Sequence, residues 1–88
     1  MIGHAALTVT IGDGMFRSER AVLFDSGGVR YNLIVDEGDV VGPDKIRVQV
    51  LQISEGGERS LVLLPRETFT TSSKLWVDSA LIAQEAIG

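Results

Sequence analysis

Glycine-rich turns recur along the chain at short and regular intervals, and this spacing restricts the folds that are open to it. Between the turns, apolar and polar residues alternate, as they do in Leu7–Ile11. A side-chain period of two is that of a half-buried strand. Turns about 8–12 residues apart are typical of all-β sandwiches and barrels. The turn segments are residues 12–14, 25–28, 36–39 and 54–58.

The stretches between the turns predict a series of short strands. Most of them alternate and contain β-branched residues. Residues 61–64 of Ser60–Leu64 are continuously apolar, which predicts a central strand covered on both faces. The predicted strands are Leu7–Ile11, Glu19–Phe24, Val29–Leu33, Ile46–Val50, Ser60–Leu64 and Leu75–Val77.

The apolar parity changes after Val50, because Leu51 and Ile53 occupy odd positions. A slip of one residue would turn the buried face of a strand outward. A β-bulge near Val50–Leu51 would restore the face and bend the strand. Burial of both faces at the end of this strand is the alternative.

At the C-terminal end, Asp78 precedes a segment with the pattern of a short amphipathic helix and is a candidate N-cap. Such a helix would pack through Leu81 and Ile82. We therefore expect a single all-β, mainly antiparallel domain over residues 1–88, with strands to about residue 77 and a helix over about 78–87. The expected architecture is a small barrel or curled sheet of about five to six strands, SH3-like or similar.

Composition excludes several kinds of chemistry. The chain has no cysteine and one histidine, which argues against disulfides, thiolate catalysis and zinc sites. The net charge of -4 argues against general nucleic-acid binding. No apolar run approaches the ~20 residues of a membrane span, and the N-terminus has no basic region, so we expect no membrane association and a cytoplasmic location. The acidic segment 36–44 lacks EF-hand spacing, and we expect no metal and no cofactor.

The segment Ala21–Gly28, AVLFDSGG, resembles the start of retropepsin-type aspartic proteases, in which two apolar residues precede Asp-Thr/Ser-Gly. The resemblance covers residues 1–35 and does not extend to the late apolar-apolar-Gly element of that family. It implies a homodimer whose two aspartates share a proton. Asp25 would be the catalytic residue, Ser26 would support the hydrogen bonds beneath it, and Gly27 would permit a close backbone approach. A turn between two strands accounts for the same residues.

No complete catalytic constellation can be drawn, so the main hypothesis is a non-enzymatic module that binds a protein partner or itself. Self-association, most simply as a dimer, would compensate for the thin core of a small chain. Phe69 and Trp76 are candidate partner-binding residues because aromatic side chains often dominate interfaces, although Trp76 could instead pack in the core. Arg30 and Arg47 are candidates if they share an outward strand face, which could alternatively bind RNA or another anion weakly.

Overall fold

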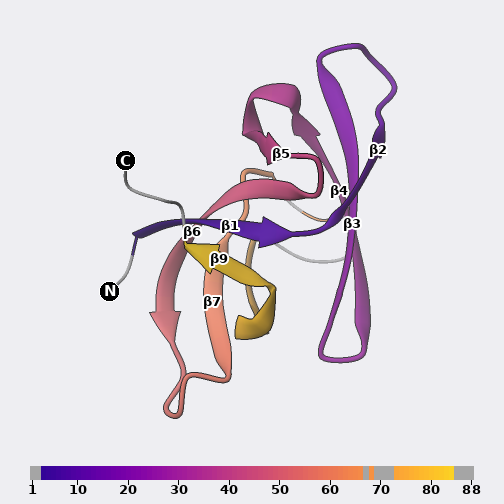
Figure 1. Cartoon of the computed structure of the whole chain (residues 1–88). Helices are drawn as coiled ribbons and strands as arrows, with labels where there is room; N and C mark the ends of the chain where they lie inside the picture. Colours follow the sequence, from indigo (N-terminus) through magenta and orange to yellow (C-terminus); the bar gives the residue numbers. More distant parts are fainter. Residues whose placement is uncertain (1–2, 67, 69–72, 85–88) are drawn as a thin grey trace.

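The computed structural model describes residues 3–66, 68 and 73–84, most of which lie in strands and tight turns (Figure 1). The described elements also include two short 3-10 turns, η1 and η2. In chain order they are β1 (Gly3–Thr8), β2 (Thr10–Asp13), β3 (Glu19–Ser26), β4 (Val29–Asp36), η1 (Glu37–Asp39), β5 (Val40–Gly42), β6 (Lys45–Ile53), β7 (Arg59–Leu63), β8 (Lys74–Asp78), η2 (Ser79–Leu81) and β9 (Ile82–Gln84).

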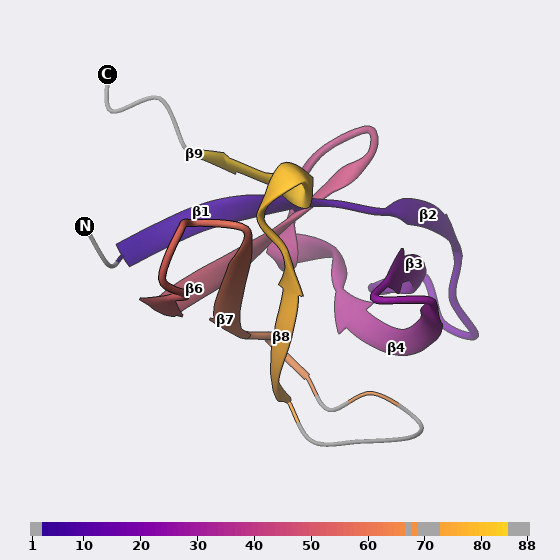
Figure 2. The same ribbon diagram turned by 90° about the horizontal axis from the view of Figure 1, so that it is seen from below.

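The strands form two antiparallel sheets. Sheet A has the strand order β8-β7-β6-β1-β9, with β5 paired to the start of β6, and sheet B has the order β2-β3-β4. Figure 2 shows the strands of sheet B together on one side of the molecule, and β1 running directly into β2. The prediction of a mainly antiparallel β-fold is confirmed. Of the predicted alternatives, a small SH3-like or similar barrel or a curled sheet of about five to six strands, the barrel is wrong, because the described strands form two sheets and do not close into one.

The change of sheet occurs at Val9, inside the segment that the sequence predicts as one strand. The Val9 N–H donates to the carbonyl of Asp44 at 2.8 Å, whereas the neighbouring residues pair with β6 on one side and with β3 on the other. Leu7 and Val9 are both buried, so the inward alternation continues through the break. The alternation therefore indicates which side chains are buried, but it does not indicate that the neighbouring strand changes from β6 to β3.

One hydrophobic core joins the inner faces of the two sheets. Leu7, Val9 and the core members on β4 and β6 follow the predicted parity. The cross-strand pair Phe24 and Tyr31 stacks with ring centroids 5.2 Å apart. The burial of these side chains is the main contribution to stability, at roughly 25 cal/mol per Å² of apolar surface. The fully buried larger side chains are Leu7, Val22, Leu33, Val35, Ile46, Val62 and Val77.

The β-bulge predicted near Val50–Leu51 is confirmed. The pairing of β6 with β7 moves from Val50↔Val62 to Gln52↔Leu61, which leaves Leu51 without a cross-strand partner. Val50 before the bulge is buried, whereas Ile53 after it is 47% exposed, so the bulge does not return this later apolar residue to the core.

The predicted C-terminal helix over residues 78–87 is wrong for its described part. Asp78 ends β8 and makes no side-chain cap, and the chain continues through η2 into β9. Strand β9 pairs with the edge of β1, with Ile82 opposite Leu7. A helix of about ten residues is marginal on its own, so pairing with an open sheet edge prevails. The helical segments among the described residues are the two three-residue turns, and neither could cross a membrane.

Candidate partner-binding site

The Asp25–Gly28 segment forms the tight end of the β3–β4 hairpin. Gly27 and Gly28 have φ angles of 59° and 77°, the left-handed conformations that a two-residue hairpin turn of type I′ requires. Asp25 stands directly opposite Arg30, which contacts the carboxylate through two bonds, Nε–Oδ1 at 2.9 Å and Nη2–Oδ2 at 3.2 Å. Both side chains are more than half exposed.

The surroundings of Asp25 favour its charged form. The hydrogen bond from Arg30 lowers the pKa of Asp25 below its ordinary value, whereas a dyad of two carboxyls sharing a proton needs a raised pKa on one of them. The buried hydroxyl of Ser26 accepts the Asp78 N–H at 2.8 Å and so ties the hairpin to β8. Each residue of the protease motif thus has a structural role within one chain. The aspartic protease hypothesis stays a prediction for a peptidase assay to test.

The two candidate arginines do not share a sheet. Arg30 lies on β4 in sheet B and is bound to Asp25, whereas Arg47 lies on the exposed face of β6 in sheet A, opposite Ala6. The single strand-face patch on which the RNA and anion hypothesis depends is therefore not formed by this pair.

Trp76 lies on the outer face of β8 and is 37% exposed. Its neighbours Leu75 and Val77 fill the core instead, and Leu61 stands opposite Trp76 on β7. The sequence predicts β7 as a strand covered on both faces, yet Leu61 is only half-buried. Trp76 thus has the exposure that partner binding requires, and its role stays a prediction. Phe69 lies outside the described residues.

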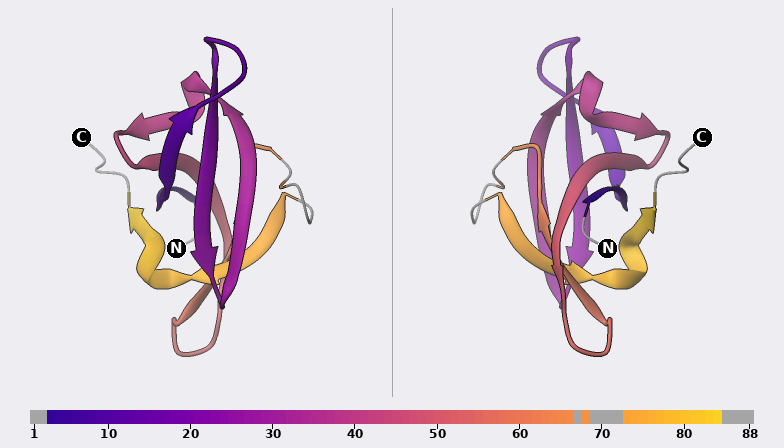
Figure 3. Two further views of the ribbon diagram at one scale, coloured as in Figure 1. Left: turned by 90° about the vertical axis from the view of Figure 1, so that its right-hand side faces the viewer. Right: turned by 90° about the vertical axis from the view of Figure 1, so that its left-hand side faces the viewer.

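Among the described residues, the most exposed large apolar side chains lie in the loop between β2 and β3, residues 14–18, here called the β2–β3 loop. Met15 is 86% exposed and Phe16 is 64% exposed. Figures 1 and 3 show this loop projecting at the end of sheet B opposite the Gly27–Gly28 turn. The loop is absent from the binding residues predicted from the sequence, although the apolar pair between glycines and polar residues in GDGMFRSER is a signal for it.

The close approach of Gly14 to Glu19 holds the two ends of the loop together. A Cβ at Gly14 would lie 2.7 Å from the Glu19 carbonyl carbon, so only glycine fits there without movement. The Glu19 N–H donates to the carbonyl of Phe16 at 3.0 Å and closes a turn over the apolar pair.

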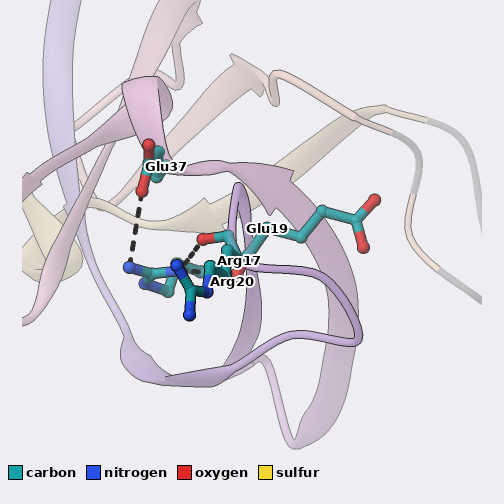
Figure 4. A network of polar contacts seen from close by, with 4 residues as sticks. All are labelled: Arg17, Glu19, Arg20 and Glu37. Atoms are coloured by element: carbon teal, nitrogen blue, oxygen red, sulfur yellow. Dashed lines mark hydrogen bonds and ion pairs between the residues drawn. The ribbon is translucent and has the colours of Figure 1, made fainter.

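Arg20 lies beside Arg17 and Glu19 and binds the loop backbone (Figure 4). Its Nη1 atom donates to the carbonyls of Arg17 and Glu19, both at 2.8 Å, and its Nη2 atom lies 3.5 Å from Glu37 Oε2. The Glu37 N–H in turn donates to the Ser18 carbonyl at 2.8 Å, which ties the loop to η1. The loop conformation is thus specified by the backbone and by a half-buried guanidinium.

The loop also encloses an open hollow of about 330 Å³, lined by Met15 and Phe16 together with Asp13, Arg17 and Arg20. An apolar projection therefore adjoins a charged recess. Comparisons of the chain with models of protein families, with curated proteins and with solved structures gave no match.

Proposed function

We propose that this domain is a non-enzymatic protein-interaction module and that the β2–β3 loop is its partner-binding element. The observation that carries the proposal is the exposure of Met15 and Phe16 on a loop whose backbone is held in place. Methionine and aromatic residues are enriched in the buried centres of protein interfaces. A pair of this kind gains burial only when another molecule covers it.

The fixed conformation of the loop supports the same function. Binding through a flexible loop loses free energy to the ordering of its backbone and side chains, and a loop that is ordered beforehand avoids part of this cost. Gly14 and Arg20 supply that order without contributing apolar contact area of their own. Met15 and Phe16 thus provide the exposed apolar surface, and Gly14 and Arg20 fix the backbone that carries it.

The complementary surface on the partner would be an apolar pocket with an acidic rim. Met15 and Phe16 would fill the pocket, and the exposed Arg17 would face the rim. No carboxylate among the described residues forms an ion pair with Arg17, so its charge remains available to a partner. Rim charges of this kind contribute to specificity and to the association rate more than to affinity.

Photo-crosslinking tests the proposal. Phe16 is replaced by p-benzoylphenylalanine in the cells that produce the protein, and a second variant carries the same label at Val41, an apolar residue that is 37% exposed on β5. We expect one discrete crosslinked protein from position 16 and none from position 41. Excess wild-type domain should suppress the crosslink, whereas the Met15→Ser/Phe16→Ser variant should not.

The double variant should fold normally, because exposed substitutions change the free energy of unfolding by about 0.5 kcal/mol or less. A thermal melt checks this point. Equal crosslinks from both labelled positions, or equal competition by the double variant, would refute the assignment of the β2–β3 loop.

A further inference from the structure

The outer edge of β4 carries backbone groups that no described strand pairs. In sheet B, β4 has one strand neighbour, β3, along eight residue pairs without a bulge. Because the hairpin turn has two residues, Ser26 and Val29 form its first hydrogen-bonded pair, and every second residue of β4 then bonds to β3. The N–H and C=O groups of the residues between them point away from β3, and of these the Asp36 N–H already donates to Asp39 Oδ2 at 3.3 Å. The residues that point away from β3 in this way are Arg30, Asn32, Ile34 and Asp36.

This edge lacks several of the features by which edge strands usually avoid pairing. It has no lysine, no proline and no bulge, and its charges stand near its two ends. The positive end is Arg30 and the negative end is Asp36. A strand with opposite charges at its two ends is complementary to a second copy of itself in the antiparallel direction.

We propose that two copies of this chain pair antiparallel through β4 about a two-fold axis at Leu33. In this register Arg30 of each copy stands opposite Asp36 of the other, and Asn32 stands opposite Ile34. The outward-pointing backbone groups of Asn32 and Ile34 then meet partners, and the Arg30 N–H meets the Asp36 carbonyl, whereas the Asp36 N–H keeps its bond to Asp39 of its own chain. The two copies of sheet B become one continuous sheet, an association through main-chain hydrogen bonds that resembles strand addition.

Charge complementarity also selects this register over its neighbours. A shift of the pairing by two residues in either direction moves Arg30 away from Asp36 of the other copy and leaves one backbone pair fewer. Within each chain Asp25 contacts Arg30 at 2.9 Å, and Arg66 contacts Asp36 at 2.8 Å. The dimer would therefore join Asp25, Arg30, Asp36 and Arg66 into a series of alternating sign. Exposed charges of this kind specify orientation more than affinity.

A charge-swap experiment tests the interface and its register together. Arg30→Asp and Asp36→Arg are made separately, and molecular mass is measured by sedimentation equilibrium at high micromolar concentration. Wild type should be dimeric. Each variant alone places two like-charge contacts in the interface, so we expect the dimer Kd to rise about tenfold or more. An equimolar mixture of the two variants restores both attractive contacts and should regain the wild-type Kd.

Asn32→Pro provides a second test that is independent of charge. It removes an N–H that faces the open edge, a place where a strand tolerates proline, and should give a monomer, whereas the control Asn32→Ala should remain a dimer. Thermal melts confirm that each variant folds. A monomeric wild type, a mixture no tighter than its components, or a dimeric Asn32→Pro would each overturn the proposal. The Met15→Ser/Phe16→Ser variant should dimerise normally, which separates this inference from the proposed function.

Discussion

The hydroxyl of Ser26 links the two sheets, and its removal gives a quantitative test of how they are held together. Ser26 is 3% exposed, and its Oγ atom accepts the Asp78 N–H at 2.8 Å across 52 residues of sequence. Ser26→Ala leaves this N–H without its partner at a place where water has limited access. The cost of an unpaired buried donor is about 1–3 kcal/mol, and we expect about 1–2 kcal/mol here because the contact is only partly buried.

The assay is chemical and thermal unfolding of wild type and variant. For a chain of this size, 1 kcal/mol corresponds to roughly 5 °C in Tm, so Tm should fall by about 5–10 °C. The matched control is Ser54→Ala, because Ser54 Oγ also accepts a backbone N–H, that of Arg59 at 3.0 Å, but in an exposed hairpin loop. The control should lose about 0.5 kcal/mol or less. Equal losses for the two variants would refute the reasoning that burial makes the Ser26 contact important.

Further substitutions test the turns and the exposed ion pair. Gly14→Ala should lower the free energy of unfolding by about 1–3 kcal/mol, because the added Cβ would meet the Glu19 backbone. In the control Gly12→Ala the added Cβ meets nothing within 4 Å, so the free energy of unfolding should not fall. Equal effects of the two substitutions in urea unfolding would contradict this reasoning. Gly28→Ala, at φ 77°, should cost about 1–2 kcal/mol in the same assay, and a cost no larger than that of Gly38→Ala would count against the turn geometry. Asp25→Asn tests the exposed ion pair. In the wild type, the hydrogen bond from Arg30 lowers the pKa of Asp25 in the folded state. The ion pair therefore contributes its full stabilisation of the fold above the unfolded pKa of about 3.9, and this stabilisation is lost as pH falls through the folded pKa. The difference in stability between wild type and Asp25→Asn should thus vanish on acidification, and a difference independent of pH would exclude this linkage.

Much of the local structure could be predicted from the sequence, because it depends on backbone geometry. The period of two identifies Leu33 and Val35 on β4 and the inward residues of β6, and the change of parity after Val50 locates the bulge at Leu51. The paired glycines Gly27 and Gly28 similarly identify a turn that requires positive φ at both positions.

The candidate site was less accessible to such reasoning. Asp25 and Ser26 were singled out for their resemblance to a catalytic motif, and the structure accounts for them as an ion pair and an inter-sheet contact. Met15 and Phe16 were passed over, since a short apolar pair predicts a strand as readily as an exposed loop. Their exposure follows from the support that Arg20 and η1 give to the loop, which joins segments distant in sequence.

The sequence by itself determined that this chain is mainly antiparallel β, the approximate extent of β3, β4, β6, β7 and β8, and the inward-facing residues of β6. Each of these features is set by neighbouring residues and by the dihedral angles that they permit. Only the tertiary structure decided that β1 and β2 belong to different sheets, and that Ile82–Gln84 is a strand beside β1. These outcomes depend on which open edge or apolar face is available to a segment. That is settled by contacts between residues far apart in the chain, about which the local pattern carries no information.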